Sequence, residues 1–441
     1  MKILDAKLSV FLHYFLIYLM LIIPGSCLFA KYLTGNMKYY VVLAFYAALY
    51  ISDGKYRKPY TVLFLGFLLA MVGFTRIITG GGAGLSTWLQ FAVCLSSVHF
   101  AILYDREHFL PRLLRTVVFF AVISNIFWAL FLLFPELVEL WPAPRFFVQS
   151  FGEQSWLKEY YAKGFLYYSF LDIHPTRNCG IYTEPGVHQI VLNGALFLLL
   201  FWREKLNLKS EKQYVFYLTV TLLTIVTCQS TTGYLGLLLI LFFYFFTQDV
   251  FGGIKMKIFV SVLMVLGLTV LLADYGTRGE ESVLYKQFIE KLFGEEGNLD
   301  LSNSTGFYRL GSIIVSLQSV LEHPLGIGFD QFVLLKEEFA DGLVAAFGIT
   351  SMAVFGVVPW LIVNAIVFLP VFKNEKPSIA ILFLLLFYNT TMAQTDWFYP
   401  LLMLVPIYYA TRESAEEGDE GEEAQLYLEN HLNEDLTFND A

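Results

Sequence analysis

Long apolar blocks alternate with short polar connections along the chain, and their lengths predict helices that cross a membrane. A crossing helix needs roughly 20 apolar residues. Twelve blocks approach or reach that length, although the second and the last two are short. They lie at about 8–30, 38–53, 60–78, 86–104, 113–134, 185–202, 213–229, 231–247, 256–274, 342–370, 377–392 and 397–411. We therefore predict an all-α polytopic membrane protein with about twelve transmembrane helices.

The charges of the short connections predict the orientation of these helices. Lys and Arg are retained on the cytoplasmic side of a membrane. If the N-terminus is inside, every inner short connection is basic, whereas the outer ones carry only Lys31, Lys38 and Arg76. The inner basic residues are Lys2, Lys7, Lys55, Arg57, Lys58, Arg106, Arg112, Arg115, Arg203, Lys205, Lys209, Lys212, Lys255, Lys257, Lys373 and Lys376. Both termini are then cytoplasmic, and two long loops, 135–184 and 275–341, emerge on the outer face.

Composition agrees with a membrane domain at 1–412 and separates it from an acidic tail at 413–441. Hydrophobic residues make up 57% of the 441 residues and charged residues only 15%, which excludes a soluble globule. The tail contains eleven Asp and Glu and no Lys or Arg, so the net charge of −9 becomes +2 without it. A polar segment of one charge sign favours disorder. We expect a disordered, solvating cytoplasmic tail, with partner binding as the alternative.

The sequence contains no pattern typical of a metal or cofactor site. The four cysteines lack CxxC spacing, and no His, Asp or Glu cluster has metal-ligand spacing. A disulfide between Cys179 and Cys228 is conceivable, but unpaired thiols are favoured. The predicted membrane segments contain no chain of ionisable residues such as proton or ion pathways use. We expect no metal, no cofactor and no nucleic-acid partner, and a coupled transporter is disfavoured.

The stretch 301–330, in the second loop, predicts an amphipathic helix that carries one arginine. Apolar residues recur at helical spacing, while Arg309, Ser312, Ser316 and Ser319 fall on another face. A Pro-Gly-rich turn follows and ends at Asp330. A solvated helix on a membrane surface and a functional arginine helix are both compatible with this pattern.

The stretch 177–196, at the end of the first loop, brings further charged residues to the predicted outer boundary. Pro185 suits the first turn of a helix, so Glu184 lies at a helix N-terminus and His188 about one turn deeper. Glu184 can simply favour the helix dipole, and a packed histidine is the simpler interpretation of His188. A surface salt bridge or a lipid headgroup competes with a functional role for Arg177.

An enzyme at the outer face meets no nucleotide sugars there, so it must take its donor from a lipid carrier. A polyprenyl diphosphate leaving group concentrates negative charge, which fixed arginines can hold without a metal. The predicted outer side contains Arg145, Arg177, Arg278 and Arg309.

Three local motifs and the loop arrangement resemble the bacterial O-antigen and capsule polymerases, called Wzy-type, which are related to the O-antigen ligases. The motifs are Arg177–Pro185 in an R-x-x-G-[IF]-x-x-E-P pattern, Ser230–Tyr234 in S-x-T-G-Y, and the arginine helix ending in H-P-L-G-x-G, Arg309–Gly328. The resemblance implies a metal-independent glycosyltransferase of the C type in a bacterial plasma membrane. Its substrates would be a polyprenyl-diphosphate-linked glycan donor and a lipid-linked acceptor, for O-antigen, capsule or exopolysaccharide. Membrane lipids, a chain-length regulator and a flippase are the other partners that it suggests.

The resemblance also suggests roles for single residues. Arg309 and Arg177 would hold the donor diphosphate, and Glu184, His323 or Asp330 would be the base. The substrate-contacting residues that we expect are Arg145, His188, Tyr308 and Ser312. The ligases carry a histidine after the second long loop, but 339–356 contains none. Polymerase is therefore the leading hypothesis, with ligase and lipid-linked glycan flippase or transporter as alternatives.

Overall fold

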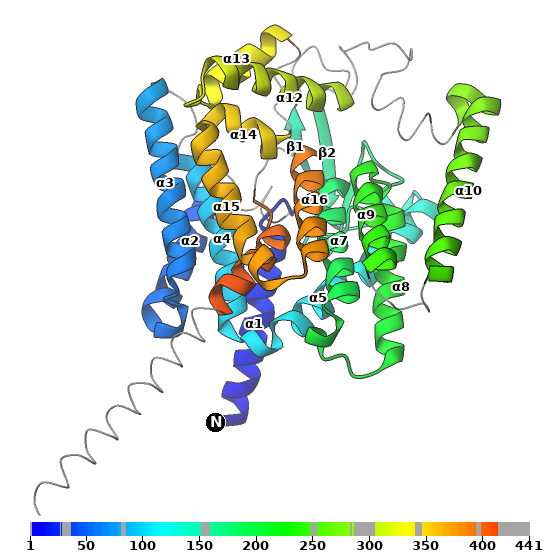
Figure 1. The fold of residues 1–441 in the computed structure, drawn as a ribbon. Coiled ribbons are helices and arrows are strands. Elements are labelled where there is room, and N and C mark those ends of the chain that lie inside the picture. Colours follow the sequence, from blue (N-terminus) through cyan, green and yellow to red (C-terminus); the bar gives the residue numbers. More distant parts are fainter. Residues whose placement is uncertain are drawn as a thin grey trace, which may run out of the picture.

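The computed structural model describes most of the chain. The described residues are 2–26, 28, 37–80, 85–150, 159–247, 254–282, 285, 305–339, 346–393 and 398–412. The acidic tail lies outside them, so its predicted disorder stays a prediction. Within these ranges the protein is a bundle of helices with one small sheet (Figure 1).

A helix occupies each of the twelve apolar blocks. The first five are α1 (Lys2–Ile22), α2 (Met37–Ser52), α3 (Pro59–Thr79), α4 (Leu85–Tyr104) and α5 (Arg106–Leu133). The next are α7 (Pro185–Phe201), α8 (Glu211–Cys228), α9 (Thr231–Thr247) and α10 (Ile254–Arg278). The last are α14 (Phe347–Phe355), α15 (Val357–Asn374), α16 (Pro377–Ala393) and a final helix at 400–412.

Length and apolar composition together make four of the described helices candidate membrane spans. These are Pro59–Thr79, Ser86–Tyr104, Arg106–Leu133 and Val357–Asn374. Shorter apolar helices accompany them, among them α7, α9 and α16. The mostly helical architecture was predicted correctly, and these apolar helices indicate a membrane-embedded protein.

The predicted block 342–370 is not one helix but two, which meet at Gly356. This glycine has a φ of +95°, a conformation that side chains rarely adopt. The amide of Gly356 ends α14 by bonding to the carbonyl of Met352, and α15 begins at the next residue. An apolar run alone predicts one helix here, because its hydropathy contains no sign of the break.

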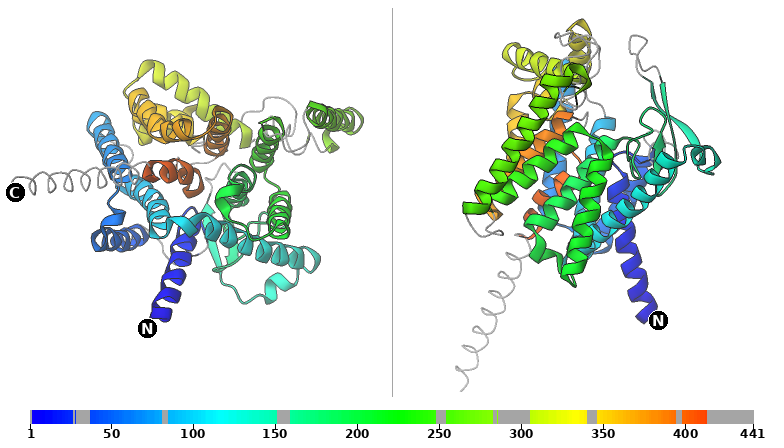
Figure 2. Two further views of the ribbon diagram at one scale, coloured as in Figure 1. Left: turned by 60° about the horizontal axis from the view of Figure 1, so that its bottom comes forward. Right: turned by 90° about the vertical axis from the view of Figure 1, so that its right-hand side faces the viewer.

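Helix α7 lies at the centre of the bundle, and thirteen of its seventeen residues are buried. It packs against α5, α8, α9 and α16. On α9, a Cβ atom at Gly233 would lie 2.8 Å from Gln189 Cβ, and one at Gly236 would lie 2.8 Å from Asn193 Nδ2. These glycines therefore allow α9 to approach α7 closely. Helix α10, in contrast, lies at the edge of the bundle (Figure 2).

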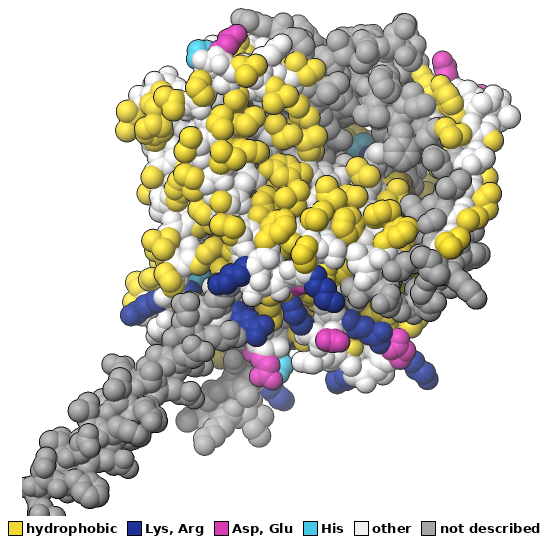
Figure 3. All heavy atoms as spheres, in the orientation of Figure 1, with side chains coloured by type: hydrophobic (Ala, Val, Ile, Leu, Met, Phe, Trp, Pro, Cys, Tyr) yellow, Lys and Arg dark blue, Asp and Glu magenta, His cyan; other side chains and the backbone are white. Residues whose placement is uncertain are grey.

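The two ends of the bundle differ in charge. Lys and Arg side chains form a band at the end where the N-terminus lies (Figure 3). In this band the Glu375 carboxylate accepts a hydrogen bond from Trp202 Nε1 at 2.6 Å and another from the Tyr409 hydroxyl. Lys205 Nζ lies 3.6 Å from the same carboxylate. This group ties the α15–α16 connection to the end of α7 and to the final helix.

The described parts of both long loops lie at the opposite end (Figure 1). The first loop contains the short helix α6 (Leu137–Leu140) and a sheet that the sequence interpretation did not include. Its strands, β1 (Arg145–Ser150), β2 (Glu159–Gly164) and β3 (Ser169–Leu171), pair antiparallel in that order. Aromatic side chains of Phe131, Trp141 and Tyr168 form a small core that fixes this loop to the end of α5.

The second loop contains α12 (Thr305–Glu322) and α13 (Phe329–Phe339), which lie across the end of the bundle above α14 and α15 (Figure 1). Thus α12 is a helix, as its apolar spacing predicts.

Candidate functional site

The segment between β3 and α7, residues 172–184, is fixed to two parts of the bundle by backbone hydrogen bonds. The amide of Thr183 donates to Gly25 O at 2.9 Å, just after α1. The amide of Asn178 donates to Thr227 O, also at 2.9 Å, in the last turn of α8. The segment is therefore held in one conformation although it contains no helix or strand.

The side chain of Asn178, which the sequence interpretation did not select, holds the segment from inside. Its Nδ2 donates to Ser124 Oγ at 3.3 Å, Asn125 Oδ1 at 3.2 Å and Thr227 Oγ1 at 3.0 Å. Its Oδ1 accepts from the amide of Gly180 at 3.1 Å. A buried amide that is satisfied on both sides fixes the backbone around it.

Gly180, within this segment, packs directly against the imidazole ring of His188 on α7. Gly180 has a φ of +58°, and a Cβ atom there would lie 2.6 Å from Cε1 of His188. The imidazole is only 4% exposed. Its Nδ1 lies 3.2 Å from Asn178 O and 3.4 Å from Cys228 Sγ. The structure thus places His188 in the packed interior, not on a surface that a substrate can reach.

Cys179 and Cys228 are both buried free thiols. The conceivable disulfide between them is therefore not formed.

Glu184 lies at the start of α7, where Pro185 occupies the first helical position, as predicted. Its backbone is extended, with φ −150° and ψ 133°, and its side chain makes no capping hydrogen bond to the helix. The carboxylate is exposed at the loop end of the bundle.

Arg177 is half-buried in the fixed segment, beside Tyr234 on α9 and within electrostatic range of Glu184. Burial lowers the pKa of Arg177, while Cys179, Tyr234 and Glu184 act to raise it. Among the described residues, no carboxylate forms a salt bridge with this guanidinium. A half-buried cation of this kind has hydrogen-bond donors to offer to an anion.

Tyr234 is the second residue of this region that the sequence interpretation left without a role, although it belongs to the S-x-T-G-Y motif. Its hydroxyl donates to Val226 O at 2.9 Å, and Gly233 N donates to Ser230 Oγ at 3.4 Å. The motif therefore shapes the start of α9, against which Arg177 lies.

Arg145 lies on β1 and is exposed. Its guanidinium forms an ion pair with Asp172 and lies over the Tyr161 ring, 5.0 Å from the centroid. These contacts hold it on the sheet, in a different environment from that of Arg177.

The structure shows which side of α12 packs against the bundle, a point that the sequence pattern left open. Ser312, Ser316 and Ser319, which were assigned to the polar face, are buried against the bundle, whereas Leu317 and Leu321 are exposed. The Ser316 hydroxyl donates to Ser312 O at 2.5 Å, so it needs no solvent. The backbone of Tyr308 and Arg309 belongs to α12, but their side chains lie outside the described residues.

The turn after α12 is locked into the break between α14 and α15. Ile327 N donates to Ala353 O at 3.0 Å, and Gly328 N donates to Val354 O at 3.1 Å. A Cβ atom on Gly326 would lie 2.7 Å from the backbone nitrogen of Gly356. Gly326, the first glycine of H-P-L-G-x-G, is therefore required for contact between two backbones.

His323 and Asp330, the candidate bases of this region, lie on either side of that turn, and both are exposed. They belong to the α12–α13 unit, whereas Arg177 and Glu184 belong to the segment before α7. Both units lie at the same end of the bundle (Figure 1).

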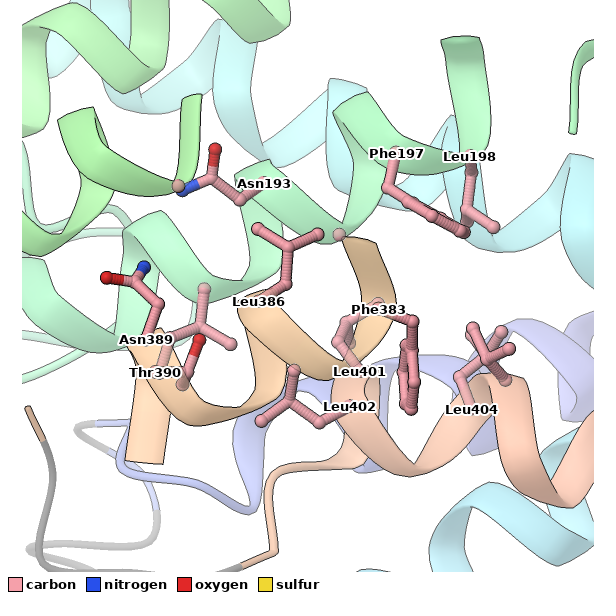
Figure 4. Close-up of a pocket in the computed structure, with 14 residues that line it drawn as sticks. Asn193, Phe197, Leu198, Phe383, Leu386, Asn389, Thr390, Leu401, Leu402 and Leu404 are labelled. Carbon is pink, nitrogen blue, oxygen red and sulfur yellow. The ribbon is translucent and has the colours of Figure 1, made fainter. Parts of the chain in front are cut away.

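A small cavity lies deeper, between α7, α9, α16 and the final helix (Figure 4). Asn193, Asn389 and Thr390 gather at one end of it, and Phe197, Phe383 and several leucines line the rest. Its volume of about 40 Å³ accommodates a few water molecules. A cavity of this size has no room for a molecule as large as a monosaccharide.

Within the described ranges, no group of three His, Cys, Asp or Glu side chains is arranged to hold a metal ion. At this end of the bundle Arg177 supplies a half-buried cation and Glu184 an exposed carboxylate. No protein-family profile, no curated protein and no solved structure matches this chain.

Proposed function

We propose that the chain is a membrane glycosyltransferase that polymerises polyprenyl-diphosphate-linked oligosaccharide repeat units at the outer face of a bacterial plasma membrane. The product would be an O-antigen, a capsule or an exopolysaccharide. On this proposal all twelve apolar blocks cross or enter the bilayer, the basic end of the bundle faces the cytoplasm, and both termini lie there.

The observation that carries the proposal is the half-buried guanidinium of Arg177 in a segment fixed by backbone hydrogen bonds. Holding a charge away from water is costly unless an anion neutralises it. A guanidinium offers two parallel donors, which match two phosphate oxygens. In the proposed reaction Arg177 stabilises the diphosphate as the glycosidic bond to it breaks, and Arg309 contributes a second cation.

The acceptor hydroxyl must lose a proton as it attacks the sugar. Glu184 is favoured as the base because it is accessible and lies within electrostatic range of Arg177. His323 and Asp330 are the other candidates, since both are exposed at the same end. His188 is assigned a structural role, because its buried ring supports the segment that carries Arg177.

The test compares Arg177→Lys and Arg177→Ala with Arg278→Lys, in cells whose own gene has been deleted. Arg278 is an exposed arginine at the end of α10, 3.4 Å from Asp274, and serves as the matched control. Loss of one electrostatic donor typically lowers a rate about 10²- to 10³-fold. We expect both Arg177 variants to yield single repeat units at normal membrane abundance, and Arg278→Lys to yield a normal glycan ladder.

A normal ladder from Arg177→Lys would refute the diphosphate role of Arg177. With purified protein and a synthetic lipid-linked unit, polymerisation should also survive EDTA. Glycan transferred only to a different acceptor would indicate a ligase, and translocation without a new glycosidic bond would indicate a flippase.

A further inference from the structure

The outward side of α12 carries two exposed leucines beside Gln318 and Glu322. Its buried side is made of small residues, namely three serines together with Gly311 and Val315. Leu317 and Leu321 are 51% and 85% exposed, and Leu325 in the following turn is 57% exposed. In water a helix normally turns such residues inward. We call these three residues the leucine face.

The leucine face continues the exposed apolar stripe of a candidate membrane span. The amide of Val357, the first residue of α15, donates to Pro324 O at 2.9 Å. Leu325 therefore lies next to the end of α15, where the exposed side chains of Val358 and Leu361 begin the stripe. In Figure 3 hydrophobic side chains cover this side of the molecule from the basic band towards the α12–α13 end.

The length of α15 sets the depth of this junction. Its 18 residues extend about 27 Å at 1.5 Å per residue, close to the thickness of a bilayer's hydrocarbon core. If α15 crosses the core, its first residues lie near the boundary between acyl chains and headgroups. The Pro324 carbonyl is bonded to that end, so the end of α12 lies at the same level.

We propose that α12 is an interfacial helix, with its leucine face in the acyl chains of the leaflet at the α12–α13 end and its serine face on α14. A lipid surface fits this face better than a soluble partner because its exposed leucines lie next to the exposed apolar side chains of α15, a candidate membrane span. Amphipathic helices bound in this way lie at the headgroup boundary. Glu322 and His323, which follow Leu321 and are exposed, then reach the headgroups.

If the proposed function holds, the depth of α12 in the membrane also matters for Arg309. Arg309 belongs to the same helix, so its backbone lies close to the level of the lipid phosphates. A lipid-linked diphosphate could meet that residue without leaving the bilayer.

The test measures the depth of fluorescent labels on the full chain in phosphatidylcholine vesicles. The parent carries Cys27→Ser, and the remaining cysteines, Cys94, Cys179 and Cys228, are buried and serve as the unlabelled background. An NBD label is placed at Leu321→Cys or, as the matched control, at Asp330→Cys on α13, which is also exposed. Vesicles contain lipids with a doxyl quencher on the acyl chain.

We expect acyl-chain doxyl to quench the label at position 321 several-fold more than the label at 330. Aqueous iodide should show the opposite order. Equal quenching at the two positions would overturn the proposal, as would a label at 321 that neither doxyl nor iodide reaches, because protein would then cover the face. The assay needs no glycan, so its outcome is separate from the success or failure of the polymerisation test.

Discussion

Substitution of Gly180 by alanine should destabilise the protein for two reasons: this residue has a left-handed φ, and the new Cβ would clash with the His188 ring. An L-residue in the left-handed region costs about 1–2 kcal/mol, and the new Cβ would lie 2.6 Å from Cε1 of a buried imidazole. Overpacking of this kind typically costs about 1–3 kcal/mol. The expected loss in free energy of unfolding for Gly180→Ala is therefore about 2–5 kcal/mol.

The double variant Gly180→Ala/His188→Ala isolates the steric part of this loss. His188→Ala alone removes a hydrogen bond and leaves a cavity, which costs about 2–4 kcal/mol. In the double variant the clash is gone, so its loss should be smaller than the sum of the two single losses by about 1–3 kcal/mol.

Thermal unfolding in detergent, with all variants in the Cys27→Ser parent, can be followed with a thiol-reactive fluorogenic maleimide, because Cys94, Cys179 and Cys228 are buried until the protein unfolds. The matched control is Gly73→Ala in α3, where a Cβ atom would meet nothing within 4 Å. Its transition should be unchanged or slightly higher, since alanine favours a helix over glycine by up to about 1 kcal/mol. A wild-type transition for Gly180→Ala, or losses that simply add in the double variant, would refute the argument.

Three further predictions address the mechanism, the orientation and the basic end. If Arg309 clamps a diphosphate, Arg309→Lys should abolish the glycan ladder as completely as Arg309→Ala, while both variants remain in the membrane at normal abundance. A normal ladder from the lysine variant would indicate that α12 has a purely structural role. A single cysteine at Gly297 should react with an impermeant thiol reagent in intact cells and one at Lys209 should not, and the reverse pattern would invert the proposed topology. Burial raises the pKa of Asp105, but hydrogen bonds from His108 and Arg112 outweigh it and hold the pKa below its usual value. Asp105 should thus stabilise the fold above about pH 4 and lose this contribution as the pH falls through its lowered pKa. Asp105→Asn should flatten this acid-side loss when thermal unfolding is followed by tryptophan fluorescence, which needs no thiolate, and an unchanged pH profile would contradict it.

The apolar runs were sufficient to predict where the helices lie, because each run must be buried in lipid or protein whatever its neighbours are. They could not predict the break at Gly356, which arises from contact with another backbone at Gly326. They also left open which face of α12 packs against the bundle. Helical spacing separates serines from leucines, but only the packing on α14 determines that the serines, which are smaller, face inward.

The sequence predicted those features of the candidate site that depend on neighbouring residues in the chain. It did not predict those that depend on contacts between distant residues. Pro185 was sufficient to place Glu184 at a helix start. The environment of Arg177 was not predictable, because it depends on contacts between distant parts of the chain. Tyr234 comes from α9, and Asn178 anchors the Arg177 segment to α5 and α8. The packed interpretation of His188 agrees with its position beside Gly180, a contact that sequence spacing alone cannot establish.

The backbone hydrogen bond between Thr183 and Gly25 has a consequence for folding during synthesis on the ribosome. Helices α2 to α6 and strands β1 to β3 lie between the two residues in the chain, and Asn178 also needs Thr227 at the end of α8. During synthesis the segment that carries Arg177 therefore emerges before one of its supports exists, and it can settle only after α8 has been added. Chains truncated before residue 227 should insert their first helices yet leave this segment unformed, so the ribosome must complete about half of the protein before the candidate site can exist.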